Sequence, residues 1–285
     1  MPTLRVRAHA ERGAAYTGFV VALSGVLMTA ALLVLWRGLL WRGRRLPGVQ
    51  RESPLLVGHR GVRGRLPENS MRAFSAALDA GLDGLETDVQ RSRDGVLVLV
   101  HDLEVDGVPV SAWSRAQLDE RVSELATLDE LLGLVRRRPG VWLNLEIKAG
   151  GLRCGRLVAE LIEAVRGSGL EDRIIVSSFN PLALACARLR APWLRTAYLW
   201  STRASAPRLL RSPWPAGWLH VDALHPHYRV VDATLVAWAR RRELAVNVWT
   251  ANEAAEVRRL VELGVDGIMA DDPTALLRAG RGGEL

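Results

Sequence analysis

The chain has 285 residues, of which 49% are hydrophobic, with a formal net charge of +7 and two cysteines, Cys154 and Cys186. This length suffices for a sizeable core in one or two domains, and two cysteines exclude a disulfide framework or a cysteine-rich metal site. The first 51 positions hold eight arginines and one acidic residue, so positions 52–285 hold 30 basic and 30 acidic residues. This balance argues against a nucleic-acid partner.

The N-terminal part contains an uncharged apolar segment at positions 16–36, YTGFVVALSGVLMTAALLVLW. It is long enough to cross a bilayer, and Trp36, Trp41 and several arginines border it as at a membrane interface. A cleavable signal peptide and a buried core helix are the alternatives. The long apolar core, with no small-residue cleavage site after it, favours a retained single-pass transmembrane helix. Five arginines after the segment and three before it favour a cytoplasmic catalytic domain.

Positions 55–277 are expected to form one folded domain. A tail (1–15), the transmembrane helix (16–36) and a basic linker (37–54) precede it, and a C-terminal tail (278–285) follows. Expected strands are 55–59, 84–90, 96–101, 141–147, 174–178, 196–199, 223–225, 244–249 and 265–269, and expected helices are 70–80, 128–137, 152–165, 181–189, 232–242 and 253–263. This alternation is typical of a parallel α/β fold, and nine strand candidates favour an irregular (β/α)8 barrel over an open sheet.

Polar residues follow most of the expected strands. They are His59, Glu86, Asp88, His101, Glu146, Lys148, Ser178 and Trp249. Because the C-terminal ends of parallel barrel strands share one face, these residues are expected to converge on one site. A doubly wound sheet would also bring these strand ends together. The pattern therefore predicts a site but does not distinguish a barrel from a doubly wound sheet.

Three carboxylates form a candidate metal site. Glu86 and Asp88 are two positions apart on one strand and therefore point to the same face, and Glu146 ends a later strand. Carboxylate oxygens favour one Mg²⁺ or Ca²⁺ ion over zinc. The alternative is that Glu86 and Asp88 are ordinary strand residues and that Glu146 pairs with Lys148 on the same strand face.

Four further residues are candidates for acid–base chemistry and anion binding. Lys148 is the only lysine of the chain, which indicates a need for a compact ammonium group, with chance retention as the alternative. Arg60 offers a planar fork suited to phosphate. His59 and His101 titrate near neutral pH, although a lone histidine at a strand end is more often a core residue. Asp102 either orients His101 or caps the following turn.

Six sequence blocks resemble the glycerophosphodiester phosphodiesterase family in order and spacing. They are HRG and PEN with GLDGLETDVQRSRDGVLVLVHD, then LNLEIK, VSSFN, HP, VNVWTAN and GVDGIMADDP. The resemblance covers roughly 55–277 and implies an irregular (β/α) barrel that hydrolyses glycerophosphodiesters to sn-glycerol 3-phosphate and an alcohol. It implies that His59 and His101 are the acid–base pair, and that Glu86, Asp88 and Glu146 hold one divalent cation.

The resemblance also implies phosphate contacts from Arg60 and Lys148, and we expect Trp249, at a strand end, to contact the substrate. Positions 103–125 are shorter than the insertion that usually covers the pocket in this family, which leaves the alcohol group open. One alternative is lysophospholipase D-like cleavage of membrane lysophospholipids, for which the membrane helix argues. The other is a catalytically silent, membrane-anchored module, against which the complete residue set argues.

Overall fold

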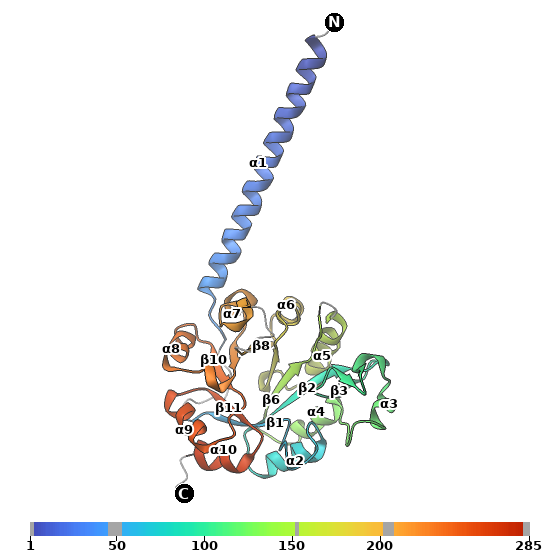
Figure 1. Cartoon of the computed structure of the whole chain (residues 1–285), viewed down its shortest axis with the longest axis vertical. Helices are drawn as coiled ribbons and strands as arrows, with labels where there is room; N and C mark the ends of the chain where they lie inside the picture. Colours follow the sequence, from blue (N-terminus) through green and yellow to red (C-terminus); the bar gives the residue numbers. More distant parts are fainter. Residues whose placement is uncertain (1–2, 45–52, 152–153, 202–207, 282–285) are drawn as a thin grey trace.

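The computed structural model describes residues 3–44, 53–151, 154–201 and 208–281. In this part of the chain, eight parallel strands close into a barrel, helices surround it, and one long helix projects outward (Figure 1). The barrel strands are β1 Leu55–His59, β2 Gly84–Arg91, β6 Trp142–Ile147, β7 Ile174–Ser178, β8 Arg195–Trp200, β9 Ala223–Pro226, β10 Ala245–Val248 and β11 Gly267–Ala270. The barrel closes because β1 pairs with both β11 and β2. The predicted α/β barrel after an N-terminal apolar helix is confirmed.

The helices around the barrel bury their apolar faces against the strands. They are α2 Met71–Asp79, α4 Leu128–Arg136, α5 Gly155–Ser168, α6 Pro181–Arg190, α7 Pro215–Leu219, α8 Ala233–Arg241, α9 Ala254–Leu263 and α10 Pro273–Gly280. Short polar side chains begin several of them: Ser70 accepts a hydrogen bond from the first turn of α2, and Thr127 and Glu130 form a reciprocal capping box on α4. Short 3-10 turns lie at Val110–Ala112, Glu171–Arg173, Arg208–Arg211 and Tyr228–Val230.

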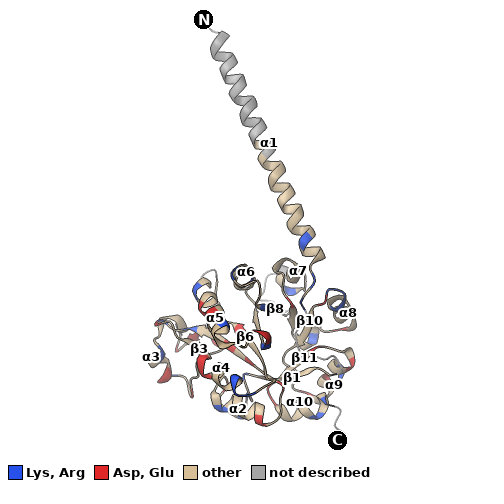
Figure 2. Cartoon of the chain, turned by 180° about the vertical axis from the view of Figure 1, so that it is seen from behind, with Lys and Arg blue, Asp and Glu red and all other residues tan. Residues whose placement is uncertain are grey.

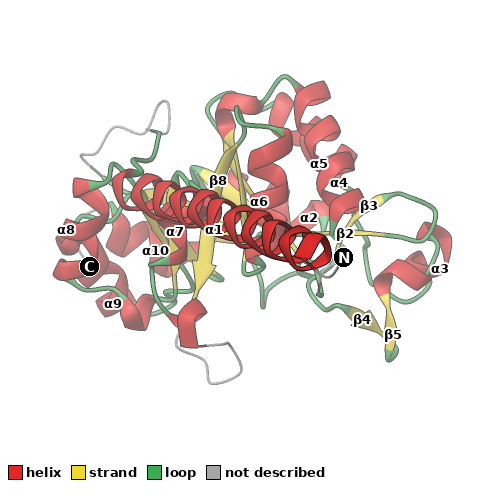
Figure 3. Cartoon of the chain, turned by 90° about the horizontal axis from the view of Figure 1, so that it is seen from above, coloured by secondary structure: helices red, strands yellow, loops and turns green. Residues whose placement is uncertain are grey.

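The barrel is irregular after β2, as the short connection predicts. The expected strand 96–101 is β3 Leu97–Leu99, which pairs antiparallel with β2 and is not one of the eight barrel strands. A hairpin of β4 Glu104–Val105 and β5 Val108–Pro109 follows, with α3 Arg115–Asp119 (Figure 3). Val98, Val110 and Leu118 form a separate apolar cluster under this segment. The short insertion therefore has a small core of its own.

The long N-terminal helix, α1 Thr3–Leu40, extends beyond the expected span 16–36 in both directions. It includes most of the expected tail 1–15 and the first four positions of the expected linker 37–54. In the described residues it is the one helix long and apolar enough to cross a membrane, with mean hydropathy 1.8 over Leu23–Leu40. Length and composition alone support that interpretation, and a signal sequence meets the same criterion.

The chain docks onto the barrel directly after α1, within the segment expected to be a linker. Trp41 Nε1 donates to Val221 O at 2.7 Å, and Arg44 makes a bidentate ion pair with the fully buried Asp222. Val221 and Asp222 immediately precede β9, so the contact lies at the N-terminal ends of the barrel strands. Positions 45–52 of the expected linker lie outside the described residues, as do the last four positions of the expected C-terminal tail.

Candidate active site

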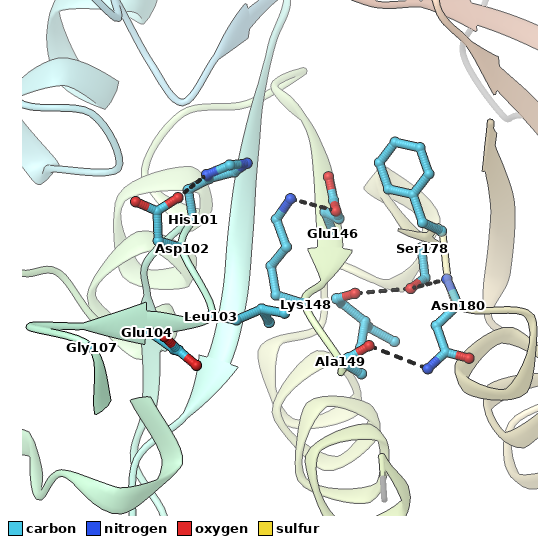
Figure 4. Close-up of a pocket in the computed structure, with 12 residues that line it drawn as sticks. His101, Asp102, Leu103, Glu104, Gly107, Glu146, Lys148, Ala149, Ser178 and Asn180 are labelled. Carbon is cyan, nitrogen blue, oxygen red and sulfur yellow. Dashed lines mark hydrogen bonds and ion pairs between the residues drawn. The ribbon is translucent and has the colours of Figure 1, made fainter. Parts of the chain in front are cut away.

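The polar residues at the C-terminal ends of the strands converge as the sequence predicts. A cavity of about 240 Å³ is lined by His59, Arg60, Arg63, Glu86, His101, Asn144, Glu146, Lys148, Phe179, Leu199, Trp249, Thr250 and Met269. These include every residue expected in the site except Asp88, which is buried next to Lys148, and Ser178, which lines an adjoining pocket. A larger pocket of about 770 Å³ adjoins the cavity and shares His101, Glu146, Lys148 and Phe179 with it (Figure 4). Residues of the β4–β5 hairpin line its far side.

Glu86, Asp88 and Glu146 form a buried carboxylate cluster, with one oxygen from each lying within 4.8 Å of the others. The register of the sheet explains this, because β2 and β6 pair in parallel with Asp88 directly opposite Glu146. Lys148 Nζ lies 2.7 Å from Glu146 Oε1 and 3.2 Å from Asp88 Oδ1 (Figure 4). The expected carboxylate set and the alternative Glu146–Lys148 pair therefore both occur, in one cluster.

The three carboxyl groups differ in acidity because their neighbours differ. Burial and the nearby Asp88 and Glu146 hold the pKa of Glu86 well above its usual value. Burial raises the pKa of Glu146 to about 7, although Lys148 acts in the opposite direction. Burial would also raise the pKa of Asp88, but Lys148, Arg60 and Asn69 together hold it below its usual value. The cluster therefore holds protons that a cation would displace.

One unpaired carboxylate oxygen indicates that these three residues fit a divalent cation. Asp88 Oδ1 is buried and has no hydrogen-bond partner among the described residues, and the Lys148 ammonium lies 3.2 Å from it. Buried carboxylate oxygens without donors are costly unless a cation neutralises them. An all-oxygen donor set suits Mg²⁺ or Ca²⁺ and does not distinguish them.

Each predicted histidine has a carboxylate partner at one ring nitrogen. His59 Nδ1 lies 2.6 Å from Asp271 Oδ1, while its Nε2 faces Glu86 Oε2 at 3.9 Å. His101 Nδ1 lies 2.7 Å from Asp102 Oδ1, so Asp102 orients His101, one of the two roles left open by the sequence. In both rings the carboxylate lies next to Nδ1, so Nε2 is the nitrogen that is not taken up by this pair.

The surroundings of His101 favour its neutral form. Partial burial and the positive charges of Lys148 and Arg60 hold the pKa of His101 below its usual value, although Asp88 and Asp102 act against them. A neutral imidazole with Nδ1–H donating to a carboxylate has an acceptor at Nε2. His101 is therefore suited to accept a proton near neutral pH.

Arg60 is held in place by several acidic partners. Its backbone N–H donates to Glu86 O at 3.0 Å, and its Nη1 donates to both oxygens of Glu68 at 3.0 and 3.1 Å. Its Nε lies 3.1 Å from Asp88 Oδ2, within ion-pair distance but not aligned for a hydrogen bond. The guanidinium lines the cavity with its charge already partly balanced.

Trp249 closes one side of the cavity with its ring. Its Nε1 donates to His225 O at 2.7 Å, and its ring packs edge-on against Phe179 and His227. Phe179 follows β7, so two different strand ends supply this apolar wall. The structure places Trp249 in the cavity, as the strand-end position predicts.

Four residues that support the site were missed as functional positions in the sequence. Asp271 is bound to His59 and is itself held by Asn252, which donates from Nδ2 to Asp271 Oδ2 at 2.7 Å. Asn69 donates to Asp88, and Glu68 binds Arg60. All four occur in the blocks PEN, VNVWTAN and GVDGIMADDP. The sequence blocks that resemble the family therefore indicated that these residues matter. The spacing of residues within a block does not show which side chains contact one another.

Comparison with known proteins agrees with this geometry. The sequence profile of the glycerophosphoryl diester phosphodiesterase family matches residues 59–275. A glycerophosphodiester phosphodiesterase from Caldanaerobacter subterraneus is 31% identical over 250 residues, which are 80% of this chain and 98% of that protein.

Solved structures share the fold. A glycerophosphodiester phosphodiesterase from Parabacteroides distasonis superposes with a TM-score of 0.71 at 23% identity, covering 81% of this chain and 98% of that one. An Oleispira antarctica phosphodiesterase, solved in complex with its product sn-glycerol-3-phosphate, superposes with a TM-score of 0.68 at 24% identity, covering 80% and 96%. The profile match over residues 59–275 and the 31% identity to the Caldanaerobacter enzyme establish that the chain belongs to the glycerophosphoryl diester phosphodiesterase family.

Proposed function

We propose that the protein hydrolyses glycerophosphodiesters to sn-glycerol 3-phosphate and an alcohol. The observation that carries the proposal is one cavity with two carboxylate-oriented histidines, His59 and His101, beside the buried carboxylate cluster. Family membership supports the same reaction, since relatives carry the name glycerophosphodiester phosphodiesterase.

In this reaction the two histidines exchange protons at the substrate. One accepts the proton of the attacking hydroxyl, which belongs either to water or to the glycerol group, and the other protonates the leaving alkoxide. Hydrogen bonds from Nδ1 to Asp271 and Asp102 fix both rings so that Nε2 can act. General acid–base catalysis of this kind contributes roughly 10²–10⁴-fold to a rate.

The charged residues balance the phosphate. Glu86, Asp88 and Glu146 would hold one Mg²⁺ or Ca²⁺ ion, which when bound withdraws charge from phosphate and acidifies a bound oxygen nucleophile. Lys148 and Arg60 contribute fixed positive charge beside the place where negative charge grows in the transition state. Trp249 forms an apolar wall against the carbon chain of the glycerol group.

A second substrate class is favoured by apolar groups at the pocket mouth. Leu103 and Phe179 line the larger pocket and are both exposed. Such side chains would contact an acyl chain better than a small polar alcohol. We therefore keep lysophospholipase D-like cleavage of lysophospholipids as the alternative, and we propose that α1 crosses the membrane once with the barrel on its cytoplasmic side.

The test is product analysis with the full chain in detergent. Release of sn-glycerol 3-phosphate is measured from glycerophosphocholine, glycerophosphoethanolamine and glycerophosphoglycerol, and alcohol release from lysophosphatidylcholine micelles, each with and without chelator. We expect metal-dependent release from at least one soluble diester and its loss in His101→Ala. Full metal-dependent activity in His101→Ala would contradict the histidine assignment, and activity on lysolipid alone would favour the alternative.

A further inference from the structure

The end of α1 is fixed against one side of the barrel. Gly38 and Gly217 of α7 are in backbone contact, and the ring of Trp218 covers Gly38 so closely that a Cβ there would collide with it. Trp41 stacks on His220 with ring centroids 4.3 Å apart, and Arg44 binds Asp222 two residues beyond His220. These contacts fix the orientation of the barrel relative to the end of α1. They therefore determine which side of the barrel faces the surroundings of that helix end.

That side of the barrel has an unusual outer surface. On α6, Leu182, Cys186 and Leu189 follow one another at helical spacing on the outward face, and the side chain of Leu189 is 83% exposed. Trp214, the residue just before α7, is 61% exposed, and Trp218 within α7 is also exposed. The outer surfaces of soluble barrel helices are normally polar.

The neighbouring α5 shows the usual pattern, with Arg156, Glu163 and Arg166 exposed on its outer side. α6 lies between α5 and α7 in the ring (Figure 1). Among the helices α5, α6 and α7, the exposed apolar residues therefore lie on α6 and α7, on the side from which α1 departs.

The same side is strongly basic. Positions 181–242 contain ten arginines and only two acidic residues, Asp222 and Asp232, although positions 52–285 as a whole are balanced. Among the arginines that the structure describes there, Arg190, Arg229, Arg240 and Arg241 are exposed. Asp222 is fully buried in ion pairs with Arg44 and Arg188, and Asp232 caps α8. In Figure 2, α6 and α8 carry basic residues, whereas acidic residues gather around α3. Exposed arginines beside exposed tryptophans and leucines match the chemistry of an anionic bilayer surface.

We propose that this surface, called here the α6–α8 face and represented by Leu182, Leu189, Trp214, Trp218 and Arg241, lies on the anionic lipid surface of the leaflet from which α1 emerges. The proposal rests on the membrane anchoring proposed above. Tryptophan and leucine side chains would enter the headgroup region, and the arginines would contact lipid phosphates.

The consequence for the active site follows from the direction of α1. Figure 1 looks roughly along the barrel, with α1 leaving next to α7 at the side of the ring, and in Figure 3, seen from above, strand β8 lies in the plane of the view. The cavity at the strand ends therefore opens along the membrane surface. The apolar stripe of α6 begins near Phe179, which lines the cavity, so bilayer docking would place the pocket mouth at the lipid surface.

The test uses the full chain in lipid nanodiscs, with the background substitutions Cys154→Ser and Cys186→Ala. An environment-sensitive fluorophore is attached in turn at Leu189→Cys on the α6–α8 face, at Met28→Cys in α1, and at Arg278→Cys on the opposite helix α10. Quenching by a spin-labelled lipid is measured in phosphatidylcholine discs with and without phosphatidylglycerol.

We expect quenching of the probes at 189 and 28 but not at 278, with quenching at 189 strengthened by phosphatidylglycerol and weakened by salt. Arg241→Glu should reduce quenching at 189, and the matched Arg278→Glu should not. Quenching at 28 without quenching at 189 would overturn the docking proposal while leaving the anchor intact. Absence of quenching at 28 would overturn the anchor itself, and product release from soluble diesters would remain a separate test of the activity.

Discussion

Replacing Asp271 with asparagine should lower kcat/KM by roughly ten- to a hundredfold. The carboxylate is 2.6 Å from His59 Nδ1 and also accepts a hydrogen bond from Asn252. An asparagine presents one acceptor oxygen and one donor group at this position, so it cannot accept from both neighbours with the same geometry. Hydrogen bonds to charged groups contribute about 1.5–3 kcal/mol, and about 1.4 kcal/mol corresponds to a tenfold change in rate. Because Asp271 is partly exposed to solvent, we expect a free-energy loss in the lower half of the range of about 1.5–3 kcal/mol.

The adjacent Asp272 provides a matched control. Asp272 caps α10 by accepting from Thr274 N at 2.7 Å and pairs with Arg65, and it does not contact either histidine. Asp272→Asn should therefore keep kcat/KM near that of the wild-type protein, because asparagine is also a good helix cap. Steady-state rates on the preferred diester, with thermal unfolding and cation affinity measured for both variants, separate an effect on His59 from general damage. Equal kcat/KM in Asp271→Asn and the wild type would refute the role assigned to Asp271.

Four further predictions concern the carboxylate cluster and the docked end of α1. Because burial raises the pKa of Glu146 to about 7 and also holds the pKa of Glu86 well above its usual value, cation affinity should rise with pH through about 7, as calorimetric titration at several pH values can test. The raised pKa of Glu146 also means that the metal-free folded state binds more protons than the unfolded state between pH 4.5 and about 7, so its stability should fall as pH rises through that window, which thermal unfolding with chelator would reveal. Lys148→Arg should lower kcat by about 10²-fold, since a guanidinium does not fit where Nζ lies 2.7 Å from Glu146; a rate close to wild type would show that any cation suffices. Asp222→Asn should lower the free energy of unfolding by about 3 kcal/mol, because the buried Arg188 loses the negative charge of its partner. Denaturant titration in detergent measures this loss, and a clearly smaller loss would contradict the explanation.

The positions of the main site residues could be predicted because strand ends are visible in the sequence. His59 and Glu86 follow β-rich runs, and a closed parallel sheet places the ends of such runs on one face. The supporting residues could not be predicted in the same way. Asp271 and Asp272 are chemically identical neighbours, and only the path of the chain between β11 and α10 gives one to His59 and the other to the helix cap.

The expected strand at 96–101 shows a second limit of sequence patterns. Val96 to Val100 has the apolar character of a barrel strand, but its connection to β2 is too short for a crossover, so it can only pair antiparallel. The expected linker shows a third. Gly43 and Arg44 have the composition of a flexible connection, yet a Cβ at Gly43 would meet Asp222 O at 2.9 Å, and Arg44 binds the carboxylate of Asp222. Side-chain complementarity of this kind depends on partners some 180 positions away.

The distribution of charged residues along the folded domain is more informative about its surface than the net charge of the whole domain. Balanced totals over 52–285 give no reason to expect nucleic acid, but they conceal ten arginines and two aspartates within 181–242. In a (β/α) barrel, successive strand–helix units are neighbours around the ring, so a continuous stretch of sequence becomes one side of the molecule. The described part of the arginine-rich stretch forms one such side, and Trp41 and Arg44 dock on the same side. Counting charges separately for each strand–helix unit therefore locates the basic side of the barrel from the sequence. The position of α1 next to that side depends on the buried Asp222, whose partner Arg44 lies 178 positions away in the sequence.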